Sequence, residues 1–150
     1  EKTGAEAYFM PVPFFANSVE DRDVMLQQRG VPEVREMAAA SSFKFVGIGT
    51  AEMTAHTVTA GVVTENAMED VRKRGGIGEL IGHFFDEGGQ RVQTKLTDRT
   101  LSVGIDALEN SRIVAVGGGD EKVPAIGAIL RSGLLNGLIT DERTAQALMT

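Results

Sequence analysis

The last third of the chain has the most regular pattern of apolar and polar positions. Residues 112–116 form a compact apolar segment that predicts a buried strand. After the break at Gly117-Gly118-Gly119, residues 120–131 place their large apolar side chains on one helical face: Val123, Ile126, Ile129 and Leu130. Residues 134–139 favour another strand, and a final helix is expected after the capping pair Thr140-Asp141.

This order of elements defines the expected fold class. The final helix is predicted to run through Leu148, which gives strand, glycine-rich turn, helix, strand and helix in succession. Such a succession is typical of a parallel sheet flanked by helices. No internal repeat or low-complexity linker divides the chain, so we expect residues 1–150 to belong to one α/β domain.

The N-terminal quarter predicts one strand and two helices. Residues 7–10 favour a strand that ends at the prolines that follow, because proline cannot donate to a ladder. Asn17-Ser18 is expected to cap a helix through Gln27. A break at Gly30 separates it from a second helix, which runs through Ala40.

The middle of the chain starts with a short strand and is then ambiguous. Residues 43–46 predict a strand that leads into Gly47-Ile48-Gly49-Thr50. Residues 51–65 remain open, because the β-branched groups at 57–59 and 62–64 favour strand but lie among small residues.

Glycines divide the following segment. A helix is expected over residues 66–74, with Gly75-Gly76 as its C-cap. Residues 78–85 favour another short helix, closed by the turn at 86–89. Residues 100–105 alternate like a strand.

Composition and charge exclude several classes of protein. The 18 glycines and 5% aromatic residues are typical of a loop-rich α/β protein. The absence of cysteine excludes disulfides, a thiol nucleophile and a thiolate zinc site, and it fits a reducing compartment, so a cytoplasmic location is expected. No apolar run is long enough for a membrane span.

The charge balance does not favour a nucleic-acid surface. The net charge is −6, and Arg72-Lys73-Arg74 is the only short basic cluster. A nucleic-acid surface needs clustered lysine and arginine, and this cluster is better interpreted as a solvated helix end. Any contact with DNA is therefore expected to come from residues outside this chain.

The glycine turn at 117–119 is the first candidate for chemistry. The turn lets the backbone approach a ligand, and Lys122 adds a positive charge near the start of the next helix, a geometry that suits an anion. The spacing matches neither a dinucleotide fingerprint nor a P-loop. Asp120 and Glu121 would repel a phosphate if they faced it, so a plain turn with an exposed lysine remains an equal alternative.

Two further glycine-rich loops are weaker candidates. Gly47 and Gly49 follow a strand, and this loop is expected to lie beside the 117–119 turn. Glu79 follows the loop at 75–78, where a carboxylate can accept hydrogen bonds from sugar hydroxyls. Glu79 can also cap the helix expected there, and the local sequence favours the capping role.

Catalytic and metal sites are not indicated. His56 and His83 are the only histidines and stand far apart, without an H-E-x-x-H pattern or cysteine ligands. No serine lies in a G-x-S-x-G or other triad context. We therefore expect no catalytic residue, no metal and no cofactor.

Five segments in order along the chain resemble the sugar-binding domain of the SorC/DeoR family of bacterial transcriptional regulators. They are MPVPFF at 10–15, FVGIG at 45–49, GGIGELIGHFFD at 75–86, VGGGDEKVPAI at 116–126 and LITDERTA at 138–145. The resemblance implies a Rossmann-like fold related to sugar-phosphate isomerases and deaminases. It also implies a phosphorylated sugar or polyol as effector. The effector is expected to bind at the C-terminal edge of the sheet and to change the affinity of the regulator for its operator.

The family pattern assigns roles to particular residues. Lys122 falls on the lysine that reaches the ligand in this family, and Glu79 falls where the family usually has aspartate. Gly117 departs from the small non-glycine residue that is common there. The expected ligand-binding residues are Glu79, Lys122, Gly118, Gly119, Gly47 and Gly49.

The resemblance also suggests what lies outside the chain. Family members carry an N-terminal helix-turn-helix and the first part of the effector domain, so this chain is expected to be the C-terminal part of that domain. The expected partners are the sugar effector, DNA through the N-terminal domain, and further copies in a dimer or tetramer, with no membrane.

Two alternatives remain at this stage. One is an isomerase or deaminase on the same fold, in which Asp-Gly-His follows the Gly-Ile-Gly turn. Here Thr50-Ala51-Glu52-Met53 follows, so Glu52 would be a base without a neighbouring histidine. The other is an oligomerisation domain with a vestigial pocket.

Overall fold

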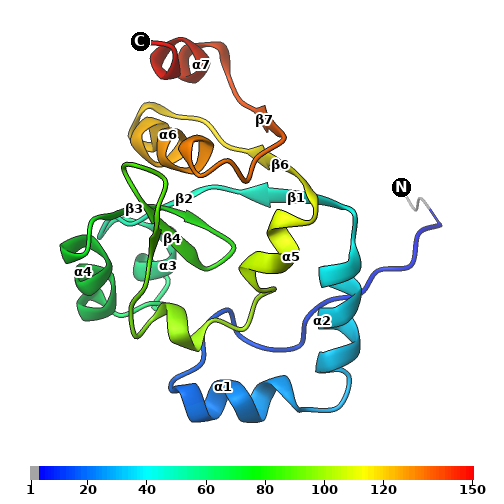
Figure 1. The fold of residues 1–150 in the computed structure, drawn as a ribbon. Coiled ribbons are helices and arrows are strands. Elements are labelled where there is room, and N and C mark those ends of the chain that lie inside the picture. The colour runs from blue at the N-terminus through cyan, green and yellow to red at the C-terminus, as the bar shows by residue number, and fades with distance from the viewer. Residues whose placement is uncertain (1–3) are drawn as a thin grey trace.

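The computed structural model describes residues 4–150 and contains two sheets (Figure 1). The first is parallel, with the strand order β1-β6-β7, and consists of β1 (Phe43–Gly47), β6 (Arg112–Val116) and β7 (Gly137–Ile139). The second is antiparallel, with the order β2-β3-β4-β5, and consists of β2 (Gly49–Thr50), β3 (Gly76–Leu80), β4 (His83–Asp86) and β5 (Arg91–Val92). The expected α/β class with a parallel sheet is confirmed.

Seven α-helices surround the sheets in the described part of the chain. They are α1 (Val19–Leu26), α2 (Val31–Ala40), α3 (His56–Thr59), α4 (Glu65–Lys73), α5 (Ile105–Glu109), α6 (Val123–Arg131) and α7 (Glu142–Leu148). Two 3₁₀ turns, η1 (Thr97–Arg99) and η2 (Asp120–Lys122), complete the elements. The predicted caps are confirmed at α1, where Ser18 accepts from Asp21 N–H, and at α7, where Asp141 accepts from Thr144 N–H.

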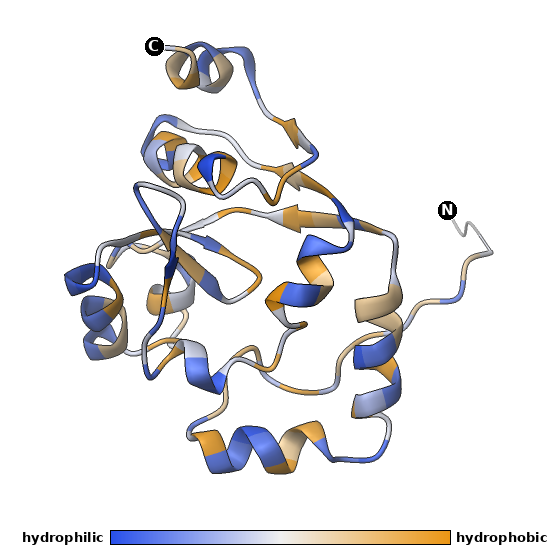
Figure 2. Cartoon of the chain, viewed as in Figure 1, coloured by the Kyte–Doolittle hydropathy of each residue, from blue (hydrophilic) through white to orange (hydrophobic). Residues whose placement is uncertain are grey.

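Two apolar clusters form the core, and the β3–β4 hairpin contributes to both. Leu80 and Phe85 pack with β6 and α6 in the first cluster, whereas Phe84 packs with Met68 and Val71 of α4 in the second. Figure 2 shows the strands of the parallel sheet as strongly hydrophobic and α4 as hydrophilic on its outer face. The hairpin therefore has buried side chains on both faces.

Close packing of α6 on β3 depends on one glycine. A Cβ at Gly78 would lie 2.8 Å from the carbonyl oxygen of Ala125, so any side chain there would push the helix away from the strand. This contact places the start of α6, and with it Lys122, next to the antiparallel sheet.

The helix predicted over residues 78–85 is wrong, because this segment forms the β3–β4 hairpin. An apolar run that is buried on both faces lacks the alternation of a half-buried strand, so its period cannot separate strand from helix. The two turn residues have positive φ values, 49° at Ile81 and 78° at Gly82. A non-glycine residue in this region costs about 1–2 kcal/mol, and tertiary contacts must hold it there.

The two strands predicted over residues 7–10 and 100–105 are also wrong. Residues 7–10 have no regular structure, and the second segment forms only an isolated bridge between Thr100 and Phe15 before α5 begins. The ambiguous residues 57–59 belong to the short helix α3. β-Propensity alone does not make a strand where no neighbouring strand is available for pairing.

Candidate functional site

A pocket of about 650 Å³ lies where β1 ends, beside the start of α6. Its polar side chains come from the β2–α3 region, β3 and η2: Thr50, Thr54, His56, Thr57, Glu79, Glu121 and Lys122. Phe14, Phe45, Val46 and Ile81 form apolar walls. We refer to it as the Glu79–Lys122 pocket.

The loop at 47–49 forms the floor of this pocket. Gly47 pairs with Val116 at the carboxyl ends of the neighbouring strands β1 and β6, so the two glycine-rich loops lie side by side as expected. Gly49 pairs with Glu79 across β2 and β3. A Cβ at Gly49 would overlap the Glu79 carboxylate, so glycine at this position leaves room for that side chain.

Glu79 lies in the strand β3 and is half-buried. The expectation from the local sequence that it caps a helix is therefore wrong. Its carboxylate accepts a hydrogen bond from the backbone N–H of Gly82, across the hairpin turn. Burial raises the pKa of Glu79, and the Gly82 N–H bond offsets part of that rise. The remaining acceptor sites of the carboxylate are available to hydroxyl donors in the pocket.

Lys122 stands at the junction of η2 and α6 and is half-buried, not fully exposed as a plain turn would place it. Its Nζ donates to the carbonyl oxygen of Ile48 at 3.2 Å, which ties the start of α6 to the pocket floor. Asp120 pairs with Arg143 at 2.5 Å and is not among the pocket-lining residues, whereas Glu121 is exposed and lines the pocket.

Gly118 and Gly119 lie outside the pocket lining, against the start of α7. A Cβ at Gly118 would overlap the Asp141 carboxylate. Gly119 has a φ of 112°, and its N–H donates to Thr144 Oγ1 at 2.9 Å. The two glycines thus let the chain turn closely around α7, while Glu79, Lys122, Gly47 and Gly49 converge on the pocket.

Thr144→Val is expected to lower the free energy of unfolding by about 1–2 kcal/mol, because it removes a hydroxyl that accepts from Gly119 N–H and donates to the Asp141 carboxylate. Thr144 is fully buried, and valine keeps its volume. Thr140→Val is the matched control, because the buried hydroxyl of Thr140 has no hydrogen-bond partner among residues 4–150. Urea unfolding of both variants measures the difference, and equal losses would contradict this role for Thr144.

Other residues singled out in the sequence lie elsewhere. Glu52 forms an ion pair with Arg72 at 2.7 Å and does not line the pocket. His83 begins β4 and is buried, with its Nε2 3.1 Å from the carbonyl oxygen of Val103, and burial lowers its pKa. His56 is exposed and lines the pocket, a role that the sequence did not reveal because it depends on the fold of residues 51–60.

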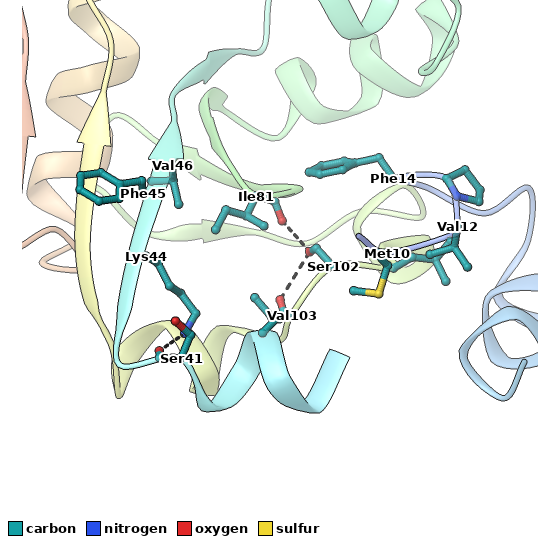
Figure 3. Close-up of a pocket in the computed structure, with 13 residues that line it drawn as sticks. Met10, Val12, Phe14, Ser41, Lys44, Phe45, Val46, Ile81, Ser102 and Val103 are labelled. Carbon is teal, nitrogen blue, oxygen red and sulfur yellow. Dashed lines mark hydrogen bonds between the residues drawn. The ribbon is translucent and has the colours of Figure 1, made fainter. Parts of the chain in front are cut away.

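A second, mostly apolar pocket of about 370 Å³ lies behind the hairpin turn (Figure 3). Ile81 lines both pockets, and Ser102 and Val103 line only the second one. Within residues 4–150, no group of three histidine or acidic side chains is arranged to hold a metal ion. No helix of this part of the chain is long and apolar enough to cross a membrane.

The model of the family described as "Putative sugar-binding domain" matches residues 1–150, and the chain belongs to this family. The fold agrees with it. The full-length sorbitol operon regulator SorC from Klebsiella pneumoniae superposes with a TM-score of 0.87 at 22% identity, over 98% of this chain and 48% of SorC. A transcriptional regulator from Streptococcus pneumoniae superposes with a TM-score of 0.86 at 28% identity, over 97% of this chain and 56% of that protein.

Curated relatives are transcriptional regulators. The erythritol catabolism regulatory protein EryD of Brucella abortus is 52% identical over 149 residues, which cover 99% of this chain and 47% of EryD. The transcriptional regulator LsrR of an Enterobacter species is 33% identical, over 93% of this chain and 45% of LsrR. The chain therefore spans about half the length of the curated relatives that it matches.

Proposed function

We propose that this chain is the effector-binding part of a transcriptional regulator. The effector in this proposal is a phosphorylated sugar or polyol that binds in the Glu79–Lys122 pocket. The supporting observation is that a carboxylate from β3 and a lysine from the start of α6 line one pocket at the carboxyl end of β1. Open α/β sheets bind their ligands at this edge. Glu79 would accept hydrogen bonds from hydroxyls, and Lys122 would pair with the phosphate.

The neighbouring residues support the same ligand chemistry. Gly47 and Gly49 keep the pocket floor free of side chains, and Phe14 and Phe45 offer apolar surface to the C–H groups of a carbon chain. Gly118 and Gly119 would act indirectly, by holding the turn that leads to Lys122. The 52% identity to an erythritol catabolism regulator favours a short polyol or its phosphate as the effector.

A thermal-shift panel tests the ligand class. The intact regulator is melted with erythritol, erythritol 4-phosphate, sorbitol, sorbitol 6-phosphate and inorganic phosphate. A ligand at about 100 times its Kd adds roughly 2.7 kcal/mol to stability. A phosphorylated polyol or sugar is expected to raise the melting temperature most. A panel in which no phosphorylated compound shifts it more than inorganic phosphate does would contradict the proposal.

The proposed role is that of a sensor without catalytic activity. Proton transfer on a sugar needs an acid and a base within reach of the substrate. Glu52, the base considered from the sequence, is engaged with Arg72 instead of lining the pocket. The relatives are regulators, which favours the same conclusion. As part of such a regulator, the chain would act in the cytoplasm and in a homo-oligomer.

This chain alone is expected not to bind operator DNA specifically. Its one basic cluster lies at the exposed end of α4, and each cation there is paired: Arg72 with Glu52, Lys73 with Glu69 and Arg74 with Asp70. DNA contact is therefore assigned to the part of the regulator outside these residues. A gel shift with the operator of the intact regulator checks this expectation. A salt-sensitive, sequence-specific complex with this chain alone would overturn it.

A further inference from the structure

The turn between β3 and β4 is a two-residue turn at Ile81 and Gly82. Both residues have positive φ, as in a type I′ turn, which ordinarily uses asparagine or glycine at the first position. A β-branched isoleucine disfavours this conformation. Contacts from outside the hairpin must therefore hold the turn in place.

Two hydroxyl groups from residues 100–102 provide such contacts. Ser102 Oγ donates to the carbonyl oxygen of Ile81 at 2.7 Å, and Thr100 Oγ1 donates to the carbonyl oxygen of Gly82 at 3.2 Å (Figure 3 for Ser102). A Cβ at Gly82 would lie 2.6 Å from Cγ2 of Thr100, so the segment also packs closely against the turn.

The contacts of Ser102 and Glu79 meet on one peptide group. The carbonyl of Ile81 and the N–H of Gly82 belong to the same planar peptide unit, in which they point in opposite directions. Ser102 holds the carbonyl end of this unit, and the Glu79 carboxylate holds the N–H end. A flip of this peptide, which interconverts type I′ and type II′ turns, would remove the N–H from Glu79.

We infer that Ser102 is a positioning residue for the Glu79–Lys122 pocket, which orients the Glu79 carboxylate through the Ile81–Gly82 peptide. Ser102 lies in the wall of the second pocket (Figure 3) and does not line the first, so its effect on the effector is indirect, through the turn that it holds. This inference rests on the proposed function for the effector, but the orientation of Glu79 can be tested without one.

The first test is an NMR titration of the Glu79 side-chain carboxyl in the ligand-free regulator. The Gly82 N–H bond lowers the pKa of Glu79, so Ser102→Ala is expected to raise it by loosening that bond. Ser102→Thr keeps a hydroxyl donor and is expected to restore the wild-type pKa. The other titratable side chains that line this pocket, namely Lys122, Glu121 and His56, are the same in every variant.

Ser132→Ala is the matched control. The Ser132 hydroxyl donates to the carbonyl oxygen of Ile129 at 2.6 Å, so the substitution removes a similar hydrogen bond outside both pockets. No change in the pKa of Glu79 is expected. If Ser102→Ala is too unstable to titrate, Ser102→Cys keeps the volume with a weaker donor and is expected to shift the pKa in the same direction. An unchanged pKa of Glu79 in Ser102→Ala, or in Ser102→Cys where the alanine variant is too unstable to titrate, would overturn the inference.

The second test measures the Kd for erythritol 4-phosphate. Ser102→Ala is expected to raise the Kd about three- to tenfold, the usual effect of one hydrogen bond. Ser102→Thr and Ser132→Ala are expected to match the wild type. Equal weakening in Ser102→Ala and Ser132→Ala would contradict a positioning role. If the wild type does not bind this compound, erythritol 4-phosphate is not the effector, and the titration still decides whether Ser102 orients Glu79.

Discussion

Glu79→Gln is expected to weaken binding of a phosphorylated sugar or polyol about 10- to 150-fold, or roughly 1.5–3 kcal/mol, the scale of a hydrogen bond to a charged group. Glutamine keeps an oxygen that can accept from Gly82 N–H, so the hairpin turn is preserved while the charge is lost. Isothermal titration of the intact regulator measures the change. Glu87→Gln, in the exposed turn after β4, is the control and is expected to bind normally.

The same substitution is expected to stabilise the protein at neutral pH. Burial raises the pKa of Glu79 in the folded state, so its contribution to stability is fully present below the unfolded pKa and is lost as pH rises through the folded pKa. Glutamine does not incur this loss. Glu79→Gln should therefore melt above the wild type at neutral pH, and the difference should shrink below about pH 4. A lower melting temperature with unchanged effector affinity would assign Glu79 a structural role.

Lys122→Ala is expected to weaken binding of a phosphorylated effector by about 1.5–3 kcal/mol, because it removes the cation that pairs with the phosphate. Binding of the corresponding unphosphorylated polyol should change much less, whereas Glu79→Gln should weaken both. Loss of the Nζ bond to Ile48 should cost about 0.5–1.5 kcal/mol of stability.

Two further variants accompany Lys122→Ala. Lys122→Met keeps most of the aliphatic stem and removes the charge. Lys73→Ala removes an exposed lysine that pairs with Glu69 and is expected to leave effector binding unchanged. Competition titrations with erythritol and erythritol 4-phosphate measure the ratio of the two affinities. If the intact regulator with Lys122→Ala binds the phosphorylated compound like the wild type, Lys122 does not contact the phosphate.

The order of elements in the last third of the chain could be predicted from the sequence. Strand β6, the glycine turn, helix α6 and the Asp141 cap of α7 are all present near their predicted places. These elements carry signals that act over a few residues: a compact apolar segment, helical spacing and a capping side chain. The neighbouring positions of the loops at 47–49 and 117–119 followed from the same logic, since parallel strands end at a common edge.

The hairpin and the composition of the pocket were decided by tertiary structure. Residues 80–85 are largely apolar, with buried side chains on both faces of the hairpin, and no local period distinguishes that situation from a helix. Glu79 and Lys122 line one pocket because Gly78 lets α6 pack directly on β3.

The sequence likewise contained no local signal for Ser102. Its bond to Ile81 joins residues 21 positions apart, and the turn that it holds has an isoleucine where asparagine or glycine is usual. Short-range patterns determined where most helices and the strands β1 and β6 begin, whereas β7 begins at Gly137 and not at residue 134 as predicted. Contacts between distant segments determined which polar groups face the ligand, because side-chain direction there depends on packing that no single segment encodes.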